Sequence, residues 1–114
     1  MKLNHINLTV TDVPATVAFL EKYFGLKSQG GNDNFAALFD DDGLVLTLMT
    51  GGWVKEVKYP STFHTGFGQE SDEKVNEIYR RLKEDGYDVE PPQRSHAWTF
   101  YVQAPGGFMV EVLS

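Results

Sequence analysis

The strongest constraint in this chain is that one order of structural signals occurs twice. Each half opens with an alternating strand pattern, continues through an amphipathic helix pattern that a glycine ends, and closes with three more strand patterns. The halves span residues 1–57 and 61–114, and a linker lies between them at about residues 53–61. The repeated β-α-β-β-β order predicts an α+β fold of two tandem modules in a single domain of 114 residues.

The first half shows these signals clearly. Apolar and polar residues alternate over 3–10, as in a strand with one buried face. Asp12 is a good helix N-cap and Gly25 a good helix end, so the sequence predicts a helix between them. Two further strands are expected at 35–39 and 44–49, joined by an Asp-Gly turn.

The second half repeats the order with few identical residues. A helix is expected from Ser71 or Asp72 to Gly86. Aligning the halves places His5 on His64. The strand patterns of this half fall at residues 63–68, 87–90, 98–102 and 108–113.

The final strand carries an acidic residue between valines, and the alignment places it on a polar residue of the first half. Glu111 falls on Thr47. A carboxylate inside an apolar strand is costly to bury unless it is paired or binds a metal. If the halves are related by an approximate two-fold axis, His5 and His64 converge with Glu111.

Two imidazoles and one carboxylate on one side of an ion form a facial triad that leaves positions open for water or substrate. The donors His5, His64 and Glu111 suit one divalent metal, namely Fe, Mn, Zn, Ni or Co. The alternative is a His–Glu hydrogen-bond cluster without metal.

Composition excludes several classes of protein. The chain has no cysteine, which removes disulfides, zinc–thiolate sites, iron–sulfur clusters and cysteine nucleophiles. Its formal net charge of −6 argues against nucleic-acid binding and suits either a solvated acidic surface or a cationic ligand. The residues before the first strand show no long apolar run and no small-residue cleavage site, so no secretory signal is expected. No apolar run is long enough for a membrane span. A cytoplasmic location is therefore expected.

Several segments, taken in order, resemble one family. They are the opening residues 5–12, the helix end Tyr23-Phe24-Gly25-Leu26, the strand with His64, and the closing residues 105–112. The whole chain resembles the vicinal oxygen chelate (VOC) superfamily, also called glyoxalase/bleomycin resistance protein/dioxygenase. The resemblance implies a cup-shaped mixed sheet with helices outside.

In this family the metal positions correspond to His5, His64 and Glu111. A fourth position, where glyoxalase I carries a carboxylate, corresponds to Thr47. A threonine is neither a good ligand nor a base, which argues against glyoxalase I itself. The remaining triad resembles the iron dioxygenases and the fosfomycin-modifying thiol transferases, although phosphonate binding would need cations near the metal.

Other residues are weaker candidates. His96 and Tyr101 are candidate general acids or bases, although His96 also fits an exposed loop residue. Thr47 is a candidate pocket residue, and aromatic residues are candidate walls of an apolar cup around the metal, or ordinary core residues. They are Phe35, Trp53, Trp98 and Phe100.

Two functions fit these observations. The first is a metal-dependent dioxygenase, lyase or transferase that binds a small substrate through neighbouring oxygens. The second is a non-catalytic protein that sequesters a drug, as bleomycin-resistance members of the family do. The resemblance also implies a homodimer.

Overall fold

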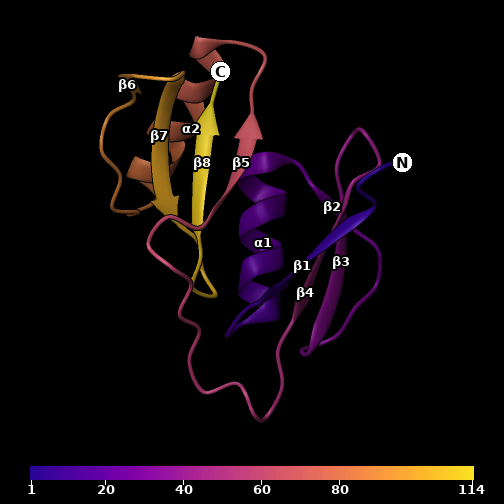
Figure 1. Ribbon diagram of the computed structural model, residues 1–114. Coiled ribbons are helices and arrows are strands. Elements are labelled where there is room, and N and C mark those ends of the chain that lie inside the picture. The colour runs from indigo at the N-terminus through magenta and orange to yellow at the C-terminus, as the bar shows by residue number, and fades with distance from the viewer. The chain divides into compact units, whose positions relative to one another are not determined.

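The protein, described by a computed structural model over residues 1–114, consists of two compact units (Figure 1). Unit 1 comprises Met1–Tyr59 and Pro105–Gly107, and unit 2 comprises Pro60–Ala104 and Phe108–Ser114. Each unit has the order β-α-β-β-β, so the predicted α+β class and the repeated modules are confirmed.

Unit 1 has a four-stranded mixed sheet in the order β1-β4-β3-β2, with one helix packed on it. Asp12 caps the helix by accepting a hydrogen bond from the Ala15 N–H at 3.0 Å, as predicted. Gly25 ends the helix at φ 68°, a left-handed conformation that favours glycine. The elements are β1 (His5–Thr9), α1 (Val13–Phe24), β2 (Lys27–Ser28), β3 (Phe35–Phe39) and β4 (Val45–Met49).

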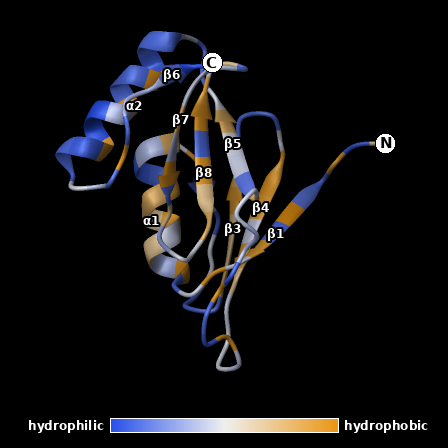
Figure 2. Cartoon of the chain, turned by 60° about the vertical axis from the view of Figure 1, so that its left-hand side comes forward, coloured by the Kyte–Doolittle hydropathy of each residue, from blue (hydrophilic) through white to orange (hydrophobic).

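Unit 2 has a second four-stranded sheet in the order β5-β8-β7-β6. Its helix is capped by Ser71, whose hydroxyl accepts from the Lys74 N–H at 3.2 Å. Most of the helix has the hydrophilic colour in Figure 2, and a hydrophilic band interrupts the hydrophobic colour of β8. The elements are β5 (His64–Gly68), α2 (Asp72–Glu84), β6 (Gln93–Arg94), β7 (Trp98–Gln103) and β8 (Met109–Leu113).

The strand registers support the alignment of the two halves. His5 pairs with Val45 in the parallel β1–β4 ladder, and His64 pairs with Met109 in the parallel β5–β8 ladder. Thr47 and Glu111 each lie two residues beyond those partners. Each therefore occupies the same place in its own sheet, on the same face as the histidine of its unit.

One predicted strand is wrong. Residues 87–90 are irregular, and the short β6 instead lies at Gln93–Arg94, after Pro91-Pro92. Proline has no N–H to give to a ladder, so β6 pairs with β7 only beyond the two prolines. Val89 is nevertheless buried, which explains why its segment has an apolar pattern.

The turn between β7 and β8 belongs to unit 1. The Thr16 hydroxyl donates to the Pro105 carbonyl at 2.9 Å, and the Thr11 N–H donates to the Gly106 carbonyl at 3.1 Å. A Cβ at Gly106 would lie 2.8 Å from Cβ of Val10, so only glycine allows this close approach.

Neither helix of the structure is long and apolar enough to cross a bilayer.

Candidate functional site

The sheet of unit 2 has one face covered by α2 and another that carries polar side chains. The residues of α2 that face the sheet are Val75, Ile78 and Leu82, all buried. Strand alternation places His64, Thr99, Tyr101 and Glu111 on the face away from α2. This face, which we call the polar face of unit 2, holds two of the three predicted metal ligands.

Glu111 lies at the centre of the polar face and is only 4% exposed. Its Oε2 accepts two hydrogen bonds of 2.6 Å, one from the Thr99 hydroxyl and one from His96 Nε2. Burial alone would raise the pKa of this carboxyl group. The bonds from Thr99 and His96, the positive charge of His96 and a bond from Tyr101 outweigh burial, so the Glu111 pKa lies below its ordinary value. Glu111 is therefore a carboxylate at neutral pH.

His64 points Nε2 at this carboxylate. Its Nδ1 lies 2.9 Å from the Thr62 carbonyl oxygen, which can only accept, so Nδ1 carries the proton. In the neutral ring Nε2 then has a lone pair, and it faces Oε1 of Glu111 at 3.3 Å. Two acceptors face each other across this gap, which requires a positive charge between them, either a proton on Nε2 or a metal ion.

The spacing of these two atoms fits a metal ion. Metal bonds to imidazole nitrogen and carboxylate oxygen are about 2.0–2.2 Å, so two ligand atoms at 90–110° on one ion lie roughly 2.9–3.5 Å apart. The Nδ1–H bond from a ligand histidine to a backbone carbonyl is also the usual way in which its tautomer is fixed. The half-site formed by His64 and Glu111 therefore has suitable donors at a suitable distance.

Tyr101 forms the rim of this half-site. Its ring meets the His64 ring edge-on, with centroids 5.6 Å apart. Burial raises the pKa of the Tyr101 hydroxyl, and the negative charge of Glu111 and the hydrogen bond to it raise that pKa further. The phenol is therefore a proton donor rather than a base at neutral pH.

Sequence reasoning missed three features of the polar face. Thr99 is buried and bonds Glu111 directly. Gly66 pairs with Glu111 in the β5–β8 ladder and puts no side chain beside the carboxylate, and Gly68 has no atom within 4 Å of an added Cβ. The available signal was glycine inside a strand, which often marks a place where a ligand approaches.

His96 contacts the site from the segment before β7. The Ser95 hydroxyl lies 2.9 Å from its Nδ1, while its Nε2 holds Glu111. Its side chain remains 56% exposed, so it joins the buried carboxylate to solvent.

The remaining predicted ligand and its partner lie in unit 1. The His5 side chain is exposed, with Nδ1 3.0 Å from the Asn4 side-chain oxygen. The Thr47 hydroxyl donates to the Asn7 side-chain oxygen at 2.8 Å, on the same face of β1–β4. Neither contact blocks Nε2 of His5.

The predicted aromatic residues lie in different surroundings. Trp98 is on the helix side of its sheet, where Nε1 donates to Asn76 of α2 at 2.8 Å, so it does not share the face of Glu111. Phe100 is buried and packs edge-on against Tyr79. In unit 1, Phe35 is 37% and Trp53 is 82% exposed.

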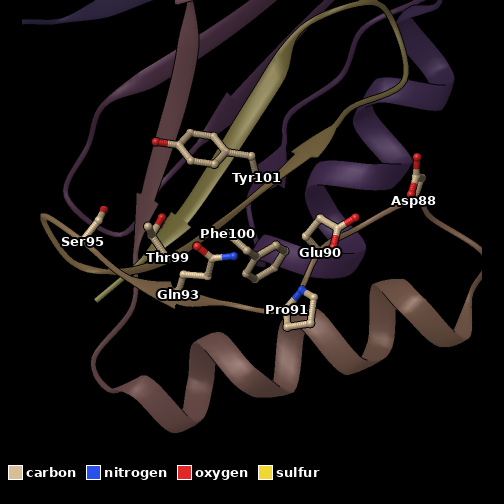
Figure 3. Close-up of a pocket in the computed structure, with 8 residues that line it drawn as sticks. All are labelled: Asp88, Glu90, Pro91, Gln93, Ser95, Thr99, Phe100 and Tyr101. Carbon is tan, nitrogen blue, oxygen red and sulfur yellow. The ribbon is translucent and has the colours of Figure 1, made fainter.

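A pocket of about 380 Å³ adjoins the polar face of unit 2 beside β7 (Figure 3). Ser95 lies at one end and Asp88 at the other, and Tyr101 stands above Thr99 and Phe100. No lysine or arginine lines it. Its walls are Asp88, Glu90, Pro91, Gln93, Ser95, Thr99, Phe100 and Tyr101.

The arginine between the wall residues Gln93 and Ser95 is engaged elsewhere. Arg94 forms an ion pair of 2.6 Å with Asp72 of α2 and stacks over the Trp98 ring at 5.2 Å. The pocket therefore has two acidic residues, Asp88 and Glu90, among polar and apolar walls, and it offers no cation to a phosphate or phosphonate.

The structure contains no group of three or more His, Asp and Glu side chains arranged to hold a metal ion. It brings together His64 and Glu111, and it places His5 in the other unit. The complete triad therefore stays a prediction.

Comparison with known proteins gives consistent results. The sequence profile of the Glyoxalase/Bleomycin resistance protein/Dioxygenase superfamily matches residues 2–112. A Bacillus cereus structure described as a possible glyoxalase is 57% identical, with a TM-score of 0.93, and the alignment covers 100% of this chain and 99% of that one.

More distant proteins differ in their described activities. A Bacillus subtilis protein described as a probable trivalent organoarsenical cleaving enzyme is 32% identical over 88 residues, which are 76% of this chain. The match spans 58% of that relative's length. A fosfomycin resistance protein from Listeria monocytogenes, solved with Mn(II) and sulfate, is 24% identical with a TM-score of 0.77, covering 99% of this chain and 89% of that one.

Proposed function

Because the chain belongs to the glyoxalase/bleomycin resistance protein/dioxygenase superfamily, we propose that it is a metal-dependent enzyme acting on a small substrate with two neighbouring oxygens. The observation that carries the proposal is that His64 Nε2 faces Oε1 of Glu111 at 3.3 Å, while Nδ1 of the same ring lies 2.9 Å from the Thr62 carbonyl oxygen. His5 is proposed as the third ligand, from its equivalence to His64 in the repeat.

The bound ion would supply Lewis acidity, or oxygen activation if it is iron. The residues of unit 2 would hold and orient the substrate. Tyr101 presents a hydroxyl at the rim and can donate a hydrogen bond to a substrate oxygen. The pocket beside Thr99 and Tyr101 can take the rest of a small molecule, since its volume is about 380 Å³.

The substrates named for two relatives fit this site poorly. Fosfomycin carries a phosphonate, and the pocket has acidic rather than basic walls, with Arg94 held by Asp72. A trivalent arsenical binds well to thiolates, and this chain has no cysteine. A neutral or cationic diol, such as a catechol, fits the site better than either.

The test is oxygen consumption by protein loaded anaerobically with Fe(II), using catechol as substrate and Zn(II) protein as the matched control. Oxygen consumption by the Fe(II) protein but not by the Zn(II) protein supports dioxygenase chemistry. Equal loss of substrate with both metals, without oxygen consumption, supports Lewis-acid chemistry. A His64→Ala variant that retains wild-type turnover would refute the assignment.

A sequestering function is the second candidate, and the acidic pocket walls favour it for a cationic drug. Such a protein needs no metal. Tight binding of bleomycin by metal-free protein, together with no turnover of any diol, would favour sequestration over catalysis.

A homodimer with two-fold symmetry is also proposed, since it is the commonest assembly of soluble chains.

A further inference from the structure

The two oxygens of Glu111 have different surroundings. Oε2 accepts from the Thr99 hydroxyl and from His96 Nε2, both at 2.6 Å. Oε1 faces His64 Nε2 at 3.3 Å. The two donors on Oε2 come from β7 and from the segment before it, so they approach from the side away from β5.

We propose that Thr99 and His96 are positioning residues. Their hydrogen bonds hold Oε2 away from the metal, so that Glu111 binds the metal through Oε1 alone. This inference rests on the metal site proposed above. A carboxylate can bind an ion through one oxygen or through both. A facial triad with one carboxylate oxygen fills three of six octahedral positions and leaves three open, whereas a carboxylate bound through both oxygens leaves two.

The number of open positions decides the chemistry. A substrate that binds through two neighbouring oxygens occupies two positions. A third position remains for water or O₂ only if Glu111 contributes a single oxygen. The hydrogen bonds to Oε2 would therefore keep open the coordination position that a second reactant, water or O₂, needs.

Both donors are well placed for this role. Thr99 is buried, and its hydroxyl donates to Oε2 of Glu111 at 2.6 Å. His96 is exposed, so its substitution leaves the core intact, and Ser95 contacts its other ring nitrogen at 2.9 Å. The Tyr101 hydroxyl also influences this carboxylate, but it lies at the open rim and is kept unchanged in the test.

The test uses Mn(II) as the probe, because it enhances the relaxation of the water protons that it coordinates. Wild-type protein is compared with the double variant Thr99→Val/His96→Leu, each with one Mn(II) per chain. The inner-sphere relaxivity of the variant is expected to fall by about one third, from three coordinated waters to two. With saturating 4-nitrocatechol, wild type should keep one water and the variant none.

Two further variants separate positioning from general damage. Thr99→Val/His96→Gln retains a side-chain N–H at residue 96 and should recover part of the relaxivity. Gln103→Ala lies on the same strand and is exposed, and it should match wild type. Circular dichroism verifies folding for each variant.

Equal relaxivity of the double variant and wild type, with Mn(II) bound to both, would overturn the positioning role of Thr99 and His96. It would not contradict the proposed metal site. Absence of bound Mn(II) in wild type by equilibrium dialysis would overturn both.

Discussion

Gly66→Val should stabilise the protein and weaken metal binding at the same time. Gly66 lies opposite Glu111 in the β5–β8 ladder, on the face that carries His64. A Cβ at this position has Leu113 Cδ2 as its nearest atom at 3.6 Å, which is ordinary van der Waals contact. The backbone of Gly66 does not have a positive φ, so valine fits without strain.

The stability gain follows from the strand position. Valine is favoured over glycine in strands on a scale that spans about 1 kcal/mol, and loss of glycine also reduces the freedom of the unfolded chain. We expect a gain of roughly 1 kcal/mol, or about 4 °C in Tm for a chain of this size.

The loss of metal binding follows from the spacing of strands. Neighbouring strands lie about 4.8 Å apart, so the valine methyl groups would stand beside the Glu111 carboxylate. They would occupy space in front of the gap between His64 and Glu111. We expect metal affinity to fall at least about tenfold, equivalent to about 1.4 kcal/mol.

The assay combines thermal unfolding of metal-free protein with Zn(II) titration against a chromophoric chelator. Gly68→Val is the matched control, because Gly68 is on the same strand and face, pairs with Leu113, and has open space around it. The control should bind Zn(II) as wild type does. Wild-type affinity in a folded Gly66→Val protein would refute the placement of the metal on this face.

Three further predictions concern stability and assembly. Tyr59→Phe removes two hydrogen bonds to the backbone of Thr9, of 2.8 and 2.9 Å, and should cost about 1–2 kcal/mol in urea unfolding; an unchanged midpoint would contradict this. The pKa of Asp72 is lowered chiefly by the Ser114 hydrogen bond, against burial, and by Arg94. The ionised Asp72 therefore stabilises the folded protein fully above the pKa of the unfolded chain, near ~3.9, and this stabilisation is lost as pH falls through the lower pKa of the folded protein. In urea unfolding at pH 2–6, the free energy of unfolding of Asp72→Asn should therefore fall less at acid pH than that of wild type. Light scattering should show a homodimer, and a species of only 12.8 kDa at tens of micromolar would contradict that prediction.

Much of the fold could be predicted because alternation and capping are local signals. The repeat gave the order of elements, and counting residues along it gave the equivalence of Thr47 and Glu111 that the registers support. The strand at 87–90 was placed wrongly, because burial of Val89 gives a strand-like pattern without a ladder.

The surroundings of Glu111 were harder to predict from sequence. Thr99 contacts Glu111 only because β7 and β8 pair in one particular register, and nothing in the local sequence fixes that register. His96 is in a segment whose direction depends on where β6 begins. Trp98 was a candidate pocket wall, but its neighbour Asn76 comes from α2, on the other face of the sheet.

The most direct test of the account is the metal content of protein purified without chelators or a histidine tag. We predict one divalent ion per chain by elemental analysis, and a sharp loss in each of the folded variants His5→Ala, His64→Ala and Glu111→Ala, while Gln103→Ala keeps its metal. Wild-type metal content in all three ligand variants would contradict the central claim.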